Sequence, residues 1–350
     1  MAQMIIPFFI IYQGCPNRCI YCNVHKTAGD FSGKITEETF RRTVQEYLNH
    51  PKRKGNGAEI AFYGGNFTGM AKDYQAELLG LASPFIEKGL VQGVRISTRP
   101  DSIDGESLGV MKRCGVTTVE IGAQSMVDEV LQLSNRGHGA SDVSAAMGML
   151  KERGFKTGIH LMAGLPGDSQ SGFEYTIGET VALKPDMVRI HPTIVLEDTG
   201  LAELFLNGTY QPLSMPRAIE MCKYALRKFE QAGIAVIRVG LQTTREMEIE
   251  GSIVAGPYHP AFRSLVEESM FFDMASAMLT DREISGQEVI FSLSPKDVSC
   301  FLGRKNKNMQ TLKETFGLTK IDVSVDPVQE RGTLAMLADG RKSMTERCRH

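Results

Sequence analysis

The 350-residue sequence lacks a charge excess, a disulfide framework, an internal repeat and a long apolar run. Its 39 Lys and Arg residues nearly balance 41 Asp and Glu residues, and the net charge of −2 argues against bulk electrostatic adhesion to nucleic acid. Seven cysteines is an odd number, and four of them are scattered singly, so we expect free thiols in a reducing cytoplasm. The apolar run near the N-terminus is only about eight residues long, and we expect a strand there, not a signal peptide or a membrane span.

The other three cysteines stand close together directly after that run. Cys15, Cys19 and Cys22 form a C-x3-C-x2-C array in the segment GCPNRCIYCN. Three thiolates on one short loop suit a soft metal centre, and a 4Fe-4S cluster held by three cysteines leaves one iron open. This spacing is typical of radical S-adenosylmethionine (SAM) enzymes, whose cofactor binds the open iron, and Tyr21 also fits their pattern. With His25 the same array suits a Cys3His zinc site, and the array alone leaves both interpretations open.

Short apolar strands recur along the chain, each followed by a stretch with helical periodicity. Repeated β-then-α units of this size predict a parallel sheet with helical crossovers. The predicted strands are Ile5–Tyr12, Glu59–Tyr63, Gly93–Arg99, Thr117–Gly122, Lys156–Met162, Met187–His191 and Ile234–Val239. The predicted helices are Thr36–Leu48, Lys72–Lys88, Ser141–Arg153, Phe173–Ala182 and Pro216–Ala232.

Polar and apolar residues alternate along these strands, which places all the polar side chains of a strand on one face. So many charged groups cannot lie in a dry core, so this face needs water or a ligand before it. A filled eight-stranded barrel has an apolar interior, and an incomplete barrel with a polar lumen therefore fits better. For some of these residues the alternative is ion-paired scaffolding. The residues that share this face, most of them polar, are Arg95, Ser97, Arg99, Thr118, Glu120, Gly122, Gln124, His160, Met162, Arg189, His191 and Arg238.

After Gly256 the pattern changes to that of a compact α+β segment. We therefore predict a partial barrel at residues 1–256, an α+β domain at 257–340 and a flexible tail at 341–350. We expect the second domain to cover the open side of the barrel, because a radical must be shielded from water. Its predicted elements are a long amphipathic helix at His259–Leu279, a helix near Asn308–Phe316, and strands at Glu288–Leu293, Lys320–Val325 and Thr333–Ala338.

Further motifs follow the cysteine array in order. YGGN (63–66) ends the second predicted strand, and Gly64 and Gly65 occupy the place where radical SAM enzymes bring backbone close to the cofactor's methionine part. Asn66 stands where an acid is usual. The other motifs are STRPD (97–101), VEIGAQSMVDEVL (119–131), NRGH (135–138), HLMAGLPGDS (160–169) and PDMVRIHPTIVLEDTGL (185–201). Together they closely resemble the radical domain of the catalytic subunit of Elongator and its bacterial relatives, over about residues 5–242.

The resemblance implies a partial (β/α)6-type radical SAM barrel that binds a 4Fe-4S cluster and SAM, and it favours the cluster over zinc. It implies reductive cleavage of SAM to a 5′-deoxyadenosyl radical, with an electron from a low-potential donor of the flavodoxin or ferredoxin type. The implied cluster ligands are Cys15, Cys19 and Cys22. Our candidates for cofactor binding are Tyr21, Gly64, Gly65, Ser97, Arg99, Glu120, Gln124, Arg136 and His160.

Two departures leave the substrate open. The Elongator subunit has a longer gap between its first two cysteines, and the 94 residues after Gly256 contain no acetyl-CoA phosphate-binding Gly loop. Carboxymethylation of a tRNA uridine through acetyl-CoA is therefore not expected. By resemblance an RNA base, in tRNA above all, is the leading substrate; the alternative within this class is a small metabolite or a tetrapyrrole. The alternative outside the class is a non-catalytic zinc- and RNA-binding protein.

A basic turn, GRKNKN at residues 303–308, precedes the predicted helix of the C-terminal segment. It resembles the loop with which RNA-binding KH modules grip a nucleic-acid backbone. The alternative is a solvated basic loop without a ligand.

Overall fold

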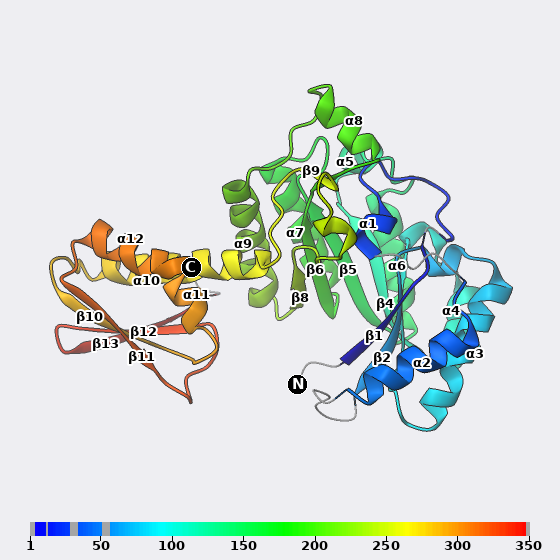
Figure 1. The fold of residues 1–350 in the computed structure, drawn as a ribbon, viewed down its shortest axis with the longest axis horizontal. Helices are drawn as coiled ribbons and strands as arrows, with labels where there is room; N and C mark the ends of the chain where they lie inside the picture. The colour runs from blue at the N-terminus through cyan, green and yellow to red at the C-terminus, as the bar shows by residue number, and fades with distance from the viewer. Residues whose placement is uncertain (1–3, 12, 29–33, 51–56, 348–350) are drawn as a thin grey trace. The chain divides into compact units, whose positions relative to one another are not determined.

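The computed structural model describes residues 4–11, 13–28, 34–50 and 57–347 (Figure 1). The chain divides into two compact units. The first comprises residues 1–214 and 234–258, and the second comprises residues 215–233 and 259–350. No helix in the described part of the chain is long and apolar enough to cross a membrane.

The first unit is built on a parallel sheet of seven strands in the order β1-β2-β3-β4-β5-β6-β8, curled into a partial barrel (Figure 1). Its strands are β1 (Met4–Phe9), β2 (Ala58–Tyr63), β3 (Gly93–Thr98), β4 (Val116–Gln124), β5 (Lys156–Ala163), β6 (Met187–Pro192) and β8 (Ala235–Val239). Its helices are α1 (Val24–Ala28), α2 (Glu37–Leu48), α3 (Lys72–Glu87), α4 (Gly105–Arg113), α5 (Asp128–Leu133), α6 (Ala140–Glu152), α7 (Gln170–Leu183) and α8 (Gly200–Leu206). A short antiparallel pair, β7 (Val195–Leu196) and β9 (Ile253–Ala255), completes the unit.

Side-chain caps set the start of three crossover helices. Thr36 accepts a hydrogen bond from the Thr39 amide at the start of α2 (3.2 Å), Asp104 accepts one from Ser107 before α4, and Ser169 accepts one from Gly172 before α7. Each cap satisfies an amide that the first helical turn leaves without a partner. Each of these helices therefore begins at a defined residue.

The predicted barrel and its strands are confirmed, with shifts of a few residues at the ends. The alternation is also confirmed at β4, where Val119 and Ile121 are buried and Glu120 and Gln124 line a cavity. Four helices of this unit, α1, α4, α5 and α8, were not predicted, because each is only five to nine residues long. The predicted end of the first strand at Tyr12 lies outside the described residues.

The second unit packs helices on one mixed sheet of four strands in the order β11-β10-β12-β13. Phe271 from α10, Phe291 from β10 and Phe301 from α11 are fully buried in its core. The helices are α9 (Met215–Gln231), α10 (Phe262–Asp281), α11 (Val298–Leu302) and α12 (Lys307–Phe316). The strands are β10 (Glu288–Leu293), β11 (Lys320–Val325), β12 (Thr333–Ala338) and β13 (Arg341–Glu346).

Two boundaries differ from the sequence-based prediction. Helix α9 belongs to the second unit, where Lys223 and Arg227 pair with Asp273 of α10 at 2.8 and 2.7 Å. Residues 341–346, expected in a flexible tail, form β13 and pair with β12, because Asp339 and Gly340 both adopt positive φ and turn the chain back. A strand was not predicted here because the segment RKSMTE is rich in charged residues. The last tail residues, 348–350, lie outside the described residues, and the covering of the barrel by the second domain stays a prediction.

Candidate functional site

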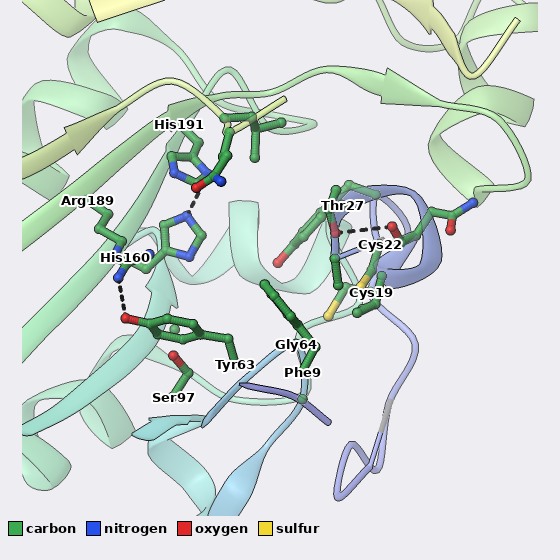
Figure 2. A pocket seen from close by; sticks show the side chains of 18 of the residues that line it. Phe9, Cys19, Cys22, Thr27, Tyr63, Gly64, Ser97, His160, Arg189 and His191 are labelled. Atoms are coloured by element: carbon green, nitrogen blue, oxygen red, sulfur yellow. Dashed lines mark hydrogen bonds between the residues drawn. The ribbon is translucent and has the colours of Figure 1, made fainter. Parts of the chain in front are cut away.

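All twelve site residues predicted from the sequence line one cavity of about 1170 Å³ in the first unit. They come from the cysteine loop after β1 and from the carboxyl-terminal parts of β2, β3, β4 and β5 or the segments that follow them. Figure 2 shows part of this cavity, with Cys19 and Cys22 on one side and Tyr63, His160, Arg189 and His191 on the other. The twelve residues are Cys15, Cys19, Tyr21, Cys22, Gly64, Gly65, Ser97, Arg99, Glu120, Gln124, Arg136 and His160.

Asn66 connects the cysteine loop to the sheet. Its side-chain amide nitrogen donates to the Gly14 carbonyl at 2.6 Å, and its oxygen accepts hydrogen bonds from the Thr98 hydroxyl at 2.7 Å and the Arg99 amide at 3.1 Å. The side chain is fully buried, so these bonds cannot be replaced by bonds to water. An amide both donates and accepts, which a carboxylate at this position could not do. The unusual residue noted in the YGGN motif thus has a structural role at the site.

The glycines around this junction are required by close backbone approach. A Cβ at Gly65 would lie 2.4 Å from the Ile10 carbonyl oxygen, and one at Gly14 would lie 2.1 Å from the Asn66 carbonyl oxygen. Gly14 and Gly64 also have positive φ angles of 74° and 83°. The glycine pair therefore brings the end of β2 against the cysteine loop and leaves its open side to the cavity.

The three cysteine thiols influence one another electrostatically. Burial, followed by the charge of Cys19, raises the pKa of Cys15, and burial with the charges of Cys19 and Cys15 raises the pKa of Cys22 to about 12. An ionised set therefore requires a cation that compensates its charge, as iron does. Among the described residues, no three His, Cys, Asp or Glu side chains are grouped closely enough to hold one metal ion. A four-iron cluster does not require this, because each cysteine binds a different iron.

Arg136 holds the middle cysteine. Its Nη1 donates to the Cys19 sulfur at 3.1 Å, its Nη2 donates to the Gly122 carbonyl, and its Nε donates to Nε2 of His138 at 3.2 Å. Burial, together with the Arg136 charge, lowers the pKa of His138 to about 4. His138 is therefore neutral near pH 7 and can accept this hydrogen bond. Tyr21, between the second and third cysteines, packs against the small apolar cluster that contains Val195.

Buried ion pairs occupy one part of the lumen. Glu120 pairs with Arg95 at 2.8 Å and with Arg189 at 2.7 Å, and Arg95 also pairs with Glu59 at 2.7 Å. Tyr63 donates to Glu120 at 3.2 Å and accepts from Arg189 at 2.7 Å; burial, with the Glu120 charge, raises the pKa of Tyr63. Arg95 and Glu120 therefore form structural ion pairs, which is the alternative that the sequence left open for the polar residues of this face. Glu120 lines the cavity, but its carboxylate is already engaged.

Other polar groups in the cavity have no protein partner in the described part of the chain. Three of them are the Gln124 side-chain oxygen, Nη1 of Arg99 and Nε2 of His191. Gln124 also has a positive φ of 70°, next to a break in the β4–β5 register, which is a strained conformation for a residue other than glycine. Buried polar atoms without partners are costly, and here all three lie on a cavity large enough for a ligand. They are therefore the best indications of bound ligand groups.

His160 and His191 form a pair on neighbouring strands (Figure 2). Nε2 of His160 lies 3.1 Å from Nδ1 of His191. Burial, with the Arg189 charge, lowers the pKa of His160 to about 3, and burial with His160 holds the pKa of His191 well below its usual range. Both imidazoles are neutral near pH 7, so one ring nitrogen of the pair donates and the other accepts.

Several polar residues of the cavity were not among the sequence-based site candidates, and four of them are Tyr63, Arg189, His191 and Arg238. Arg238 donates to Gln242 at 3.1 Å, and burial together with the Arg189 charge lowers its pKa. Three of the four stand at alternating polar positions of β6 and β8, so the signal was present in the sequence. Arg189 and His191 also lie within the PDMVRIHPTIVLEDTGL motif, but the motif by itself assigns them no role.

Comparisons with known proteins agree with this geometry. The sequence profile of the Radical SAM superfamily matches residues 9–180, and that of the Radical SAM C-terminal domain matches residues 185–271. A tRNA uridine(34) acetyltransferase of Methanocaldococcus jannaschii is 38% identical over 254 residues, which cover 61% of this chain and 46% of that protein. Human Elongator complex protein 3 is 34% identical over 147 residues, which cover 40% of this chain and 26% of that protein.

A solved structure also resembles this chain over most of its length. Elp3 of Methanocaldococcus infernus, with an N-terminal deletion, superposes with a TM-score of 0.60 at 25% identity, covering 76% of this chain and 62% of that one. The chain spans less than half the length of the two curated relatives named above. The two consecutive profile matches, the curled parallel sheet and the cysteine loop at its edge show that the chain belongs to the radical SAM superfamily.

Proposed function

We propose that this protein is a cytoplasmic radical SAM enzyme that reductively cleaves SAM at a 4Fe-4S cluster held by Cys15, Cys19 and Cys22. The observation that carries the proposal is the convergence of the three thiols and nine further predicted residues on one cavity. When bound, the cluster and SAM would supply an electron and a 5′-deoxyadenosyl radical, which the side chains of a protein cannot supply. The electron would come from a low-potential donor of the flavodoxin or ferredoxin type.

The residues of the chain fit these two groups in distinct ways. Arg136 places a positive charge and a hydrogen-bond donor at the Cys19 sulfur, and such a group would stabilise negative charge on a bound cluster. The unpartnered atoms of Gln124 and Arg99 lie on the same cavity and can bind the polar ends of SAM. The ion pairs of Arg95, Glu120 and Arg189 hold β3, β4 and β6 at fixed positions and thereby keep the cavity open.

For the substrate, we propose an RNA base, in tRNA above all. The support is the similarity to the Methanocaldococcus jannaschii relative, which is named as a tRNA uridine(34) acetyltransferase. His191 and Arg238 line the cavity on β6 and β8, where a ring nitrogen and a guanidinium can bind the carbonyl oxygens of a base. A small metabolite remains the second candidate, because a cavity of about 1170 Å³ also holds a free molecule of that size.

One experiment tests both parts of the proposal. The protein, reconstituted with iron and sulfide under anaerobic conditions, is reduced with dithionite and supplied with SAM, alone, with cellular RNA, or with a small-metabolite extract. We expect 5′-deoxyadenosine in all three samples and additional formation with RNA. If no 5′-deoxyadenosine is formed under any condition, the proposed radical activity is refuted. If only the metabolite extract increases its formation, the proposal of an RNA substrate is refuted.

A further inference from the structure

The basic loop at residues 303–307 lies in the second unit and has no part in the cavity described above. It joins α11 to α12, and these two helices connect strands β10 and β11. The two strands are parallel neighbours, with Glu288 opposite Lys320 and Leu293 opposite Val325. The loop is therefore the link between the helices of a β-α-α-β unit on the edge of one sheet, and it is a defined part of the fold.

The side-chain cations of this loop form no ion pair with a carboxylate of the described residues, although the Arg304 backbone amide donates to the Glu268 carboxylate at 3.3 Å and its guanidinium lies 3.4 Å from Nε2 of His259. Arg304, Lys305 and Lys307 are exposed, and none of them forms an ion pair within the described part of the chain. Elsewhere in the unit many cations are paired, such as Lys223 with Asp273 and Arg331 with Asp297. Three unpaired cations within four residues create a local positive potential in a chain whose net charge is −2.

The loop is also held in a fixed conformation. The side-chain nitrogen of Asn308 donates to the carbonyl oxygens of Glu268 at 2.9 Å and Phe301 at 3.2 Å, which ties the loop to α10 and α11. A Cβ at Gly303 would lie 3.0 Å from Cγ of Asn308, so glycine allows this side chain to pass. Such an anchored loop loses little conformational freedom when it binds a ligand.

The basic loop leads directly into helix α12. Lys305 and Asn306 have positive φ angles of 54° and 60°, and α12 starts directly afterwards without a side-chain cap from Asn306. The amino-terminal end of α12, with its partial positive charge, therefore follows directly on this run of cations. Phosphate oxygens accept hydrogen bonds and carry negative charge, so a phosphodiester chain matches both features.

We propose that the loop formed by residues 303–307 binds the phosphate backbone of single-stranded RNA. A loop of this length between two helices grips one strand, in the manner by which helix-linking loops of RNA-binding modules hold a few nucleotides. The choice of RNA over DNA rests on the proposed function, whereas phosphate binding by the loop does not. The loop supplies affinity without base recognition, because each of its groups is suited to phosphate.

The test uses the full-length protein and a fluorescent oligouridine of about 12 nucleotides, with affinity measured by anisotropy between about 50 and 200 mM salt. The loop variant carries Arg304→Gln, Lys305→Gln and Lys307→Gln. The control variant carries Lys320→Gln, Arg341→Gln and Lys342→Gln, which removes three exposed cations of the same unit outside the loop. A further variant, Lys305→Asp, reverses one charge at a positive φ that aspartate tolerates, so it keeps the fold.

We expect the loop variant to bind about tenfold more weakly or worse. The log of its association constant should also fall less steeply with the log of the salt concentration, with a slope smaller in magnitude by about 2, as three lost phosphate contacts require. Lys305→Asp should weaken binding at unchanged thermal stability, and the control should bind as the parent does. The inference is wrong if the parent does not bind the oligouridine, if the loop variant keeps its affinity and slope, or if the control loses as much. Loop-dependent binding to anionic vesicles without RNA binding would likewise overturn it. Formation of 5′-deoxyadenosine without RNA is measured on the same proteins. If it is retained while RNA binding is absent, the inference about the loop fails and the proposed radical activity stands.

Discussion

Nη1 of Arg136 lies 3.1 Å from Sγ of Cys19, so the middle ligand of the proposed cluster has a charged hydrogen-bond donor of its own. Arg136 is itself fixed by the Gly122 carbonyl at a glycine of β4 and by neutral His138. The central strand of the sheet thereby contributes to the environment of one thiol in the loop after β1. Hydrogen bonds to cysteine sulfur and nearby positive charge both favour the reduced form of an iron–sulfur cluster.

Replacing Arg136 should therefore change the redox properties of the cluster. In Arg136→Gln the positive charge is lost, and we expect the midpoint potential to become more negative by tens of millivolts, because the reduced cluster loses stabilisation. Redox titration followed by electron paramagnetic resonance measures this. Arg113, an exposed arginine at the end of α4, gives the matched control Arg113→Gln. An unchanged or more positive potential in Arg136→Gln would contradict the assigned contact.

Glu120 should matter more for stability than for ligand binding. Glu120→Ala leaves Arg95 and Arg189 without their shared carboxylate, and breaking a buried pair in this way costs about 3–5 kcal/mol. Gln124→Ala removes a side chain whose oxygen has no partner among the described residues, and should cost less than about 1 kcal/mol. Hydrogen exchange of β4 in the two variants distinguishes these effects. Equal protection of β4 in both would show that the ion pairs contribute nothing.

The faces of β4 can be tested with a neighbouring residue. Ile121 is fully buried, so Ile121→Asp buries an unpaired carboxylate and should destabilise the first unit by several kcal/mol, on the order of the largest single-residue effects. Urea unfolding of Ile121→Asp and of Gln124→Ala gives the comparison. If both variants unfold at the same urea concentration, the assignment of the two faces is wrong.

The histidine pair should make the first unit sensitive to acid. The folded-state pKa of His160 is about 3, below its unfolded value, so between these two values the unfolded chain binds the extra proton. Stability is therefore complete above about pH 6.5 and falls as the pH decreases toward 3, with a loss of about 1.4 kcal/mol at pH 5.5 for one histidine. Urea unfolding at pH 7.0 and pH 5.5 measures it, with each pH held to about 0.1 unit.

Two substitutions complete that measurement. His160→Gln should lose one histidine's share of the difference between the two pH values, because glutamine does not titrate, whereas buried His138 and His191 still do. His50→Gln, at an exposed histidine of the same unit, should retain it. A His160→Gln protein with the full pH dependence would place its origin elsewhere.

The sequence predicted the barrel because its β-α periods and alternating strands are local patterns that need no tertiary information. The twelve site residues followed from motifs at strand ends, and the parallel sheet brings such ends to one edge. The pairing of Glu120 with Arg189 could not be predicted, because it depends on how far the sheet curls between β4 and β6. The role of Asn66 was hidden for the same reason: its partners are up to 52 positions away in the chain.

Two predicted domain boundaries differ from the structure for a similar physical reason. β13 is rich in charged residues and gains its stability from pairing with β12, and α9 is assigned to the second unit by contacts with α10. Both depend on a partner that is distant or unrecognised in the sequence.

The central claim is tested most directly by the iron content and SAM cleavage of cysteine variants. Cys15→Ala, Cys19→Ala and Cys22→Ala are compared with Cys222→Ala, at a buried cysteine of α9. Each protein is reconstituted anaerobically, analysed for iron and sulfide, and assayed for 5′-deoxyadenosine with dithionite and SAM. The account predicts a brown parent and Cys222→Ala protein with about four irons per chain and active cleavage, whereas the three ligand variants lose most iron and all cleavage. A colourless parent that binds zinc, or a Cys22→Ala protein that keeps four irons and cleaves SAM, would contradict it.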